Sequence, residues 1–197
     1  MAWWQPKTWR LFKEPYPDQY QEHPLAKPIG DIPPGSVVLC SSNKFDFISW
    51  VIRKVTRARV SHAMMYWGSG CHETVEAEPK GIRKDTLDKR INSRDMLWIW
   101  RYKPLTVEQL MLMKGYSYGS IGKPYDFEAF VGFALGGGHP TESKAICSEN
   151  VVRTTGIAGI PGPNKSPDKV APSTLDEWYR GHPEWELWDT QNVKVLG

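Results

Sequence analysis

Long apolar runs are missing from this 197-residue sequence. The longest apolar stretch, around Phe130 to Leu135, is far shorter than the ~20 residues that a membrane-spanning helix needs, so we expect no membrane span. A basic start followed by an apolar block is also missing, because the chain opens Met-Ala-Trp-Trp-Gln-Pro, which is not the pattern of a secretory signal. We therefore expect a protein made in the cytoplasm without a signal peptide.

Cysteine is scarce, with three residues: Cys40, Cys71 and Cys147. An odd number cannot all pair, and none belongs to a Cys-x-x-Cys unit, which favours reduced thiols and leaves room for one reactive thiol. A zinc site built from these cysteines with His62 and His72 would match no structural zinc spacing, and the adjacent Cys71-His72 pair is poorly placed for chelation. We expect no metal and no other cofactor.

A large excess of one charge is absent as well. The 25 basic and 22 acidic residues give a formal net charge of +3, which is too small to indicate a nucleic-acid partner. The run Gly136-Gly137-Gly138 is not followed by Gly-Lys-Ser or Gly-Lys-Thr, so it is not a phosphate-binding P-loop. We therefore expect neither a nucleic-acid partner nor a bound nucleotide.

Tryptophan and proline are plentiful, and they gather toward the ends of the chain. Five of the ten tryptophans lie outside the central region: Trp3, Trp4, Trp9, Trp185 and Trp188. Residues 1–29 are interrupted by proline every few positions, which excludes a long helix or a central strand, so we interpret them as an extended arm. The chain then divides into this Pro/Trp-rich arm, a body over residues 30–180 and a Trp-containing tail over residues 181–197. The arm either packs on its own domain or binds a protein partner.

Hydrophobic periodicity predicts strands first and helices later along the body. Four short apolar runs are interpreted as strands, at residues 36–40, 60–67, 72–78 and 96–102. Helices are predicted at residues 43–56, 106–114 and 147–156, and between Asp126 and the glycine run at 136–138. A last short helix is predicted near residue 173, capped by Ser173 with Asp176. Thr106 with Gln109 is a capping box, and a basic loop or short helix joins the third and fourth strands. This order predicts an α+β fold.

Three residues could form a nucleophilic site. Cys147 stands at the predicted start of a helix, where backbone N–H groups and the helix dipole stabilise a thiolate. A nucleophilic cysteine needs a base and a group that orients the base. His62 and Glu76 lie 14 positions apart on two strands joined by a tight turn, which can place them side by side. Each residue also has an ordinary alternative, as a packed thiol, a core histidine or a strand-edge acid, and the pattern alone leaves both interpretations open.

Four short motifs occur in the order found in a known family. They are Ser61-His62-Ala63-Met64, Val75-Glu76-Ala77-Glu78-Pro79-Lys80-Gly81-Ile82, Gly122-Lys123-Pro124-Tyr125-Asp126 and Ile146-Cys147-Ser148-Glu149-Asn150. Together they resemble the YiiX/YebB-like branch of the NlpC-type, papain-like cysteine hydrolases. In that branch the fold is circularly permuted, so the histidine strand precedes the cysteine helix. The resemblance covers about residues 30–180.

The resemblance implies a fold and a role for each site residue. The fold would be a permuted papain-like one, with a small antiparallel sheet packed against helices and the nucleophile at a helix N-terminus. Cys147 would be the nucleophile, His62 the general base and Glu76 the acid that orients the base. The residues expected to line the substrate site are Tyr125, Asp126 and Ser61. The backbone N–H of Cys147 would be the first oxyanion donor.

The same resemblance implies acyl transfer through an acyl-enzyme, as in a cysteine peptidase or amidase. Peptidoglycan peptides are the commoner substrates of NlpC-type relatives, and hydrolysis or transfer of lipid acyl groups is the alternative within the same chemistry. The other class of function is a structural or assembly protein on this fold with little or no catalysis. A phage virion or tail component would combine cell-wall degradation with protein docking through the Trp- and Pro-rich termini.

Overall fold

The computed structural model describes residues 32–41, 58, 60–68, 71–92, 96–126 and 146–192. Three predictions lie outside these ranges: the arm over residues 1–29, the helix over residues 43–56, and the helix that ends at the glycine run 136–138. Among the helices described, none is both long enough and apolar enough to span a membrane.

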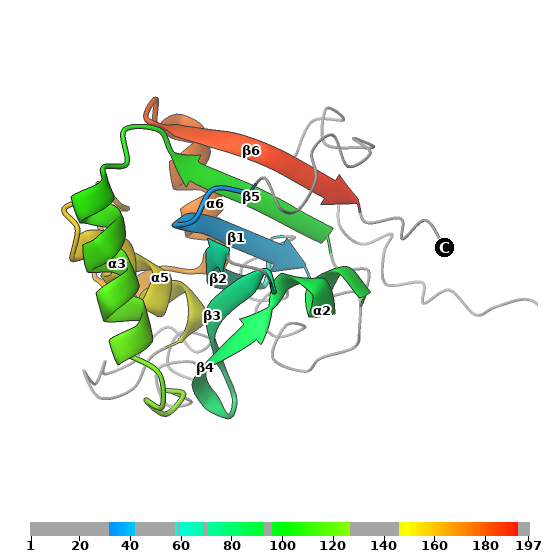
Figure 1. The fold of residues 1–197 in the computed structure, drawn as a ribbon. Helices are drawn as coiled ribbons and strands as arrows, with labels where there is room; N and C mark the ends of the chain where they lie inside the picture. Colours follow the sequence, from blue (N-terminus) through cyan, green and yellow to red (C-terminus); the bar gives the residue numbers. More distant parts are fainter. Residues whose placement is uncertain are drawn as a thin grey trace, which may run out of the picture.

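A six-stranded antiparallel sheet forms the centre of the fold (Figure 1). Its strands are β1 (Ser36–Ser41), β2 (His62–Gly68), β3 (Glu73–Glu78), β4 (Gly81–Thr86), β5 (Met96–Tyr102) and β6 (Trp185–Asn192). They lie in the order β4-β3-β2-β1-β5-β6, and every neighbouring pair is antiparallel. The chain leaves the β4 edge and returns beyond β1 as β5, which places β1 and β2 in the middle of the sheet.

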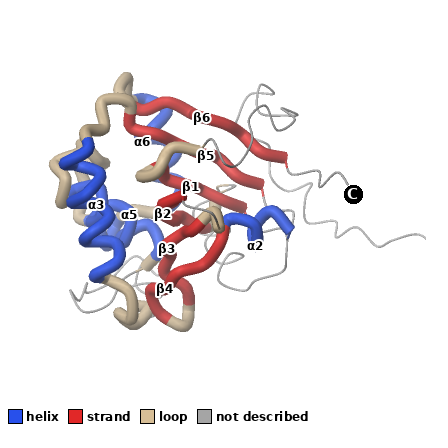
Figure 2. Tube along the Cα trace, in the orientation of Figure 1, coloured by secondary structure: helices blue, strands red, loops and turns tan. Residues whose placement is uncertain are grey.

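Helices lie on both sides of this sheet (Figure 2). They are α2 (Leu87–Asn92), α3 (Val107–Gly119), α5 (Cys147–Gly156) and α6 (Pro172–Gly181), with a 3-10 turn, η4, at Pro167–Lys169. Met113, Val151 and Leu175 bring α3, α5 and α6 into one large apolar cluster, whereas Leu87 brings α2 into a smaller one. The two clusters correspond to the two faces of the central strands.

The central strands are buried on both faces, so their side chains alternate between the two clusters. In β1, Val37 and Leu39 join the large cluster, whereas Val38 and Cys40 join the small one. The same alternation runs along β2. A strand that is covered on both faces has a continuous apolar sequence instead of an alternating one. That is why β1 and β2 are readily recognised from sequence as short apolar runs.

The predicted strands at β1, β2, β3 and β5 and the predicted helix at α5 are all present, which confirms the α+β class. The capping box before α3 is also present: the Gln109 N–H donates to Thr106 Oγ1 at 3.2 Å, and the Thr106 N–H donates to the Gln109 side chain at 3.1 Å. The helix runs past its predicted end to Gly119. Its later turns are held because Ser117 is buried and accepts a hydrogen bond from the Trp67 indole at 3.1 Å.

Three other elements differ from the sequence-based expectation. The basic stretch after β3 contains the strand β4 as well as the helix α2. The residues of β6, expected to belong to a tail, pair with β5, and Trp185 is buried. The predicted cap of α6 by Ser173 and Asp176 is wrong, because the N-cap is Ala171 and makes no side-chain cap. Asp176 instead accepts a hydrogen bond from the Trp100 indole at 3.2 Å, on the side of the helix that packs against the sheet.

Candidate active site

Cys147 is the first residue of α5, the helix that packs against β2. Two hydrogen bonds hold the start of this helix. Glu149 Oε2 accepts from the Ile146 N–H at 3.3 Å, and Ser148 Oγ donates to the Val170 carbonyl at 2.5 Å. These bonds fix the backbone on either side of the thiol, which is 3% exposed. The sulfur therefore lies at a helix N-terminus, where the local dipole favours a negative charge.

His62 and Glu76 meet across the β2–β3 hairpin. Glu76 pairs in register with Met64, so His62 is its diagonal neighbour on the same face of the sheet. The distance from His62 Nε2 to Glu76 Oε2 is 2.6 Å, and the Glu76 side chain is fully buried. Because Nε2 is engaged by the carboxylate, Nδ1 is the ring nitrogen available to interact with Cys147, the group that raises the pKa of His62 most.

Cys147 and His62 stabilise each other's charged form. Burial raises the pKa of the Cys147 thiol, but the charge of His62, its hydrogen bond, and the backbone N–H groups of Ala63 and Ser148 together bring that pKa below its usual value. Burial lowers the pKa of His62, but the Cys147 thiolate and the Glu76 carboxylate raise it to about 9. These contacts therefore favour a thiolate–imidazolium pair over a neutral thiol and a neutral imidazole.

Glu76 is held as an anion between two cations. Burial raises its pKa, but the hydrogen bonds and charges of His62 and Arg90 lower it to about 2. Both cations bind Oε2. The other oxygen, Oε1, is buried and has no hydrogen-bond partner within the described part of the chain. An ionised carboxylate against one ring nitrogen fixes the tautomer and orientation of the imidazole and stabilises the imidazolium.

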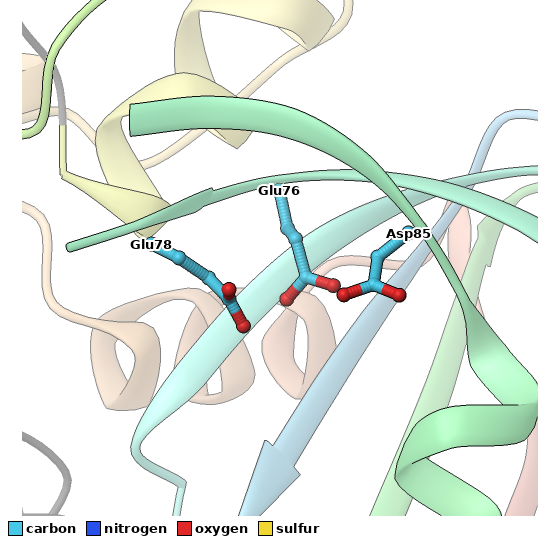
Figure 3. A group of neighbouring side chains, drawn as sticks. All are labelled: Glu76, Glu78 and Asp85. Carbon is cyan, nitrogen blue, oxygen red and sulfur yellow. The ribbon is translucent and has the colours of Figure 1, made fainter. Parts of the chain in front are cut away.

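An acidic cluster lies on β3 and β4, where Glu76, Glu78 and Asp85 bring oxygens within 4.8 Å of one another (Figure 3). Basic side chains already neutralise all three carboxylates: Arg90 binds Glu76 and Glu78, Arg83 binds Glu78 and Asp85, and Lys89 binds Asp85. A divalent metal here would sit beside three cations within ion-pair distance. The cluster therefore does not fit a metal site, and it forms an ion-pair network that runs from Glu76 toward the surface.

The three residues predicted to line the substrate site are also buried. Ser61 precedes His62, and its hydroxyl lies 3.5 Å from the Cys40 carbonyl oxygen. Tyr125 belongs to the same large apolar cluster as Cys147, and Asp126 follows it along the chain. Their roles in substrate binding stay predictions.

Two of the sequence motifs meet at the start of β4. The Ile82 N–H donates to the Lys123 carbonyl at 2.8 Å, and the Gly122 N–H donates to the Ile82 carbonyl at 2.9 Å. Gly81 has a φ of 103°, and a Cβ there would lie 2.7 Å from the Lys123 carbonyl oxygen. Only glycine fits such a position. This close approach anchors the segment that leads to Tyr125.

Arg90 is a site residue that the sequence does not single out. It is one of six basic residues between Glu78 and Met96, and no spacing rule separates it from the other five. Its contact with Glu76 depends on β4 pairing with β3 and on α2 starting directly after β4. Recognition of β4 as a strand would have placed Arg90 near Glu76, but the polar sequence of β4 does not predict a strand.

A scan against protein-family models and a search of the curated proteins gave no match. A search of solved structures matched the crystal structure of metalloprotein YiiX from Escherichia coli O157:H7, with a TM-score of 0.60. The chain has a YiiX-like fold. The match covers 81% of this chain and 97% of the YiiX chain, at 18% sequence identity. At that identity the likeness concerns the fold alone, and the chemistry of the site has to be argued from its own residues.

Proposed function

We propose that this protein is a cysteine hydrolase of the NlpC type, on a permuted papain-like fold, that cleaves an amide bond through an acyl-enzyme. One observation carries the proposal: a thiol at a helix N-terminus is paired with His62, which is held in turn by Glu76 at 2.6 Å. The order His62, Glu76, Cys147 along the chain agrees with the permuted branch, and the YiiX-like fold is compatible with it.

Acylation follows from the charge state of the pair. The Cys147 thiolate attacks the carbonyl carbon of the substrate, and the carbonyl oxygen becomes an oxyanion. The backbone N–H of Cys147, at the start of α5, is the first donor to that oxyanion. The carbon–nitrogen bond then breaks, and the His62 imidazolium gives its proton to the leaving amine. The products of this half-reaction are a thioester on Cys147 and a neutral His62.

Deacylation uses the same two groups in the reverse roles. Neutral His62 takes a proton from a water molecule, and the resulting hydroxide attacks the thioester carbonyl. The carbon–sulfur bond breaks, the acid product leaves, and the thiolate–imidazolium pair is restored. Glu76 stabilises the imidazolium whenever it forms, without itself taking up the proton.

A peptidoglycan peptide is the substrate that the family resemblance favours, and a lipid ester would pass through the same acyl-enzyme. The matched YiiX structure is described as a metalloprotein. We route no step through a metal in this protein, because Arg83, Lys89 and Arg90 already neutralise the acidic cluster. A place in a phage virion or tail, with docking through the termini, stays a prediction that rests on the sequence.

Selective alkylation tests the nucleophile. An activated thiolate reacts with iodoacetamide at about pH 6, well below the usual thiol pKa of about 8.5. Cys147 should therefore be modified much faster than Cys71, which is exposed and serves as the internal control. Equal slow rates at the two cysteines would overturn the proposal.

Substrate cleavage tests the reaction. The purified protein is incubated with muropeptides and, separately, with lipid esters, alongside a Cys147→Ala control that is checked for folding by circular dichroism. A new muropeptide fragment that requires Cys147 supports the amidase proposal. Release of fatty acid alone would mean that the substrate is a lipid ester and not an amide. If neither substrate gives a product that requires Cys147, the hydrolase proposal fails and the structural or assembly function remains.

A further inference from the structure

We propose that Arg90 is a positioning residue of this site: it clamps the Glu76 carboxylate against the His62 ring and so sets the lower pH limit at which the Cys147–His62 pair stays charged. This inference rests on the proposed function, since it concerns the same site. It adds a fourth residue, on a different element, to the arrangement of Cys147, His62 and Glu76.

The carboxylate of Glu76 has two donors in the described structure, and both bind one oxygen. His62 Nε2 and Arg90 Nη2 share Oε2, whereas Oε1 is buried without a partner there. A buried carboxylate needs hydrogen bonds or charge to remain ionised. If Arg90 is removed, His62 is the one remaining donor to Glu76 among these contacts. The guanidinium is therefore one of two donors that keep this buried carboxylate ionised.

Arg90 is itself placed by packing and by a second carboxylate. The helix α2 is anchored by Leu87, which is fully buried, and the Leu87 N–H donates to the His72 carbonyl at 2.9 Å. The His72 ring adds a contact of 3.0 Å with Asp88 on the same helix. At the side chain, Arg90 Nη2 also donates to Glu78 Oε1 at 2.7 Å. These contacts fix the direction from which Arg90 reaches Glu76.

Charged and titratable groups surround this clamp from every neighbouring strand: Cys40 from β1, His62 from β2, Glu76 and Glu78 from β3, and Arg83 and Asp85 from β4. Burial lowers the pKa of Arg90, but Glu76, Cys40 and Glu78 raise it well above its usual value. Arg90 therefore stays charged over the whole working range, and Glu76 is the group that titrates when the clamp is lost.

The direction of the effect follows from this arrangement. Without Arg90, the pKa of buried Glu76 rises, because desolvation is then opposed by His62 alone. Below the new pKa, Glu76 is neutral and no longer stabilises the imidazolium, so the thiolate–imidazolium pair gives way to a neutral thiol and imidazole. Above that pKa, Glu76 is ionised again and the pair reforms. Loss of Arg90 should therefore raise the pH below which Cys147 loses its reactivity, and it should leave the reactivity at higher pH unchanged.

The test measures the rate of Cys147 alkylation by iodoacetamide as a function of pH in four proteins. They are the wild type, Arg90→Gln, the charge-retaining Arg90→Lys, and Arg83→Gln, which removes one charge from the same network at a residue whose ion pairs are with Glu78 and Asp85. We expect the acid limb of Arg90→Gln to move up by about one pH unit, a tenfold loss of rate on that limb, with the plateau kept. Arg90→Lys should show a smaller shift than Arg90→Gln, because it keeps the positive charge, and the profile of Arg83→Gln should match that of the wild type.

The possible results separate this inference from the proposed function. If the wild-type Cys147 is no faster than Cys71, the proposed function fails, and this inference fails with it. If the wild type is activated but the Arg90→Gln profile superimposes on it, the inference alone is overturned. An equal shift in Arg83→Gln would also overturn it, because a change in net charge would then explain the result. If Arg90→Gln does not fold, Arg90→Met, which keeps an unbranched side chain and removes the charge, takes its place, and an unshifted acid limb in that variant would overturn the inference.

Discussion

Replacement of Glu76 by glutamine removes the charge beside His62 and keeps the shape of the side chain. The pKa of His62 stands at about 9 against an ordinary 6.5, a rise of about 2.5 units to which Cys147 contributes more than Glu76 does. A hydrogen bond to a charged group contributes about 1.5–3 kcal/mol, so loss of the Glu76 carboxylate should weaken the imidazolium, and the thiolate paired with it, by about tenfold or more. The Glu76→Gln variant should therefore lose about tenfold in its Cys147 alkylation rate at about pH 6.

The matched control for this variant is Glu78→Gln. Glu78 binds the same Arg90 but makes no contact with His62, so its loss should leave most of the alkylation rate in place. Thermal unfolding, followed by circular dichroism, verifies that both variants are folded at the temperature of the assay. If folded Glu76→Gln reacts at the wild-type rate throughout the acid range, then Glu76 does not support the imidazolium, and the electrostatic reasoning is refuted.

Three further predictions concern the stability of the fold. The folded pKa of Glu76 is about 2, below the ordinary 4.5, so its contribution to folding stability is present above pH 4.5 and is lost as the pH falls toward 2. The difference of about 2.5 pKa units corresponds to about 3 kcal/mol. In Glu76→Gln, the free energy of urea unfolding should therefore change less with pH over this range, by about that amount. Gly81→Ala should destabilise by roughly 1–3 kcal/mol and by more than Gly122→Ala, because both glycines have positive φ but only Gly81 meets the Lys123 carbonyl; equal losses in urea unfolding would contradict this. Trp100→Phe should cost about 1–3 kcal/mol by leaving a buried Asp176 oxygen without its indole donor, and a thermal melt unchanged from the wild type would contradict that role.

The strands that the sequence reveals are those with an apolar composition. β1 and β2 are buried on both faces and form continuous apolar runs, and β5 is buried over most of its length. The two edge strands, β4 and β6, are more polar, with sequences Gly-Ile-Arg-Lys-Asp-Thr and Trp-Glu-Leu-Trp-Asp-Thr-Gln-Asn. An edge strand needs few apolar side chains, so its sequence resembles that of a loop. Such polar sequences predict a loop or short helix at the residues of β4 and a tail at the residues of β6.

The proximity of His62 and Glu76 could be predicted because it depends on one hairpin. Strands joined by a short turn pair with each other, and the spacing of the two residues then makes them neighbours. The contact of Cys147 with this pair required the family resemblance, because α5 reaches β2 from a distant part of the sequence. Arg90 could not be predicted in either way. Its contact depends on the register of β4 and on the placement of α2, neither of which a charged side chain reveals.

The claim on which the rest depends is that Cys147 is a thiolate near neutral pH. The direct measurement is the ultraviolet absorbance of the thiolate, titrated with pH in the wild type and in Cys147→Ala, so that the difference reports Cys147 alone. A thiol paired with His62 should give a full thiolate signal already at about pH 6 and lose it only in stronger acid. A difference signal that develops only around the ordinary thiol pKa of about 8.5 would contradict the claim.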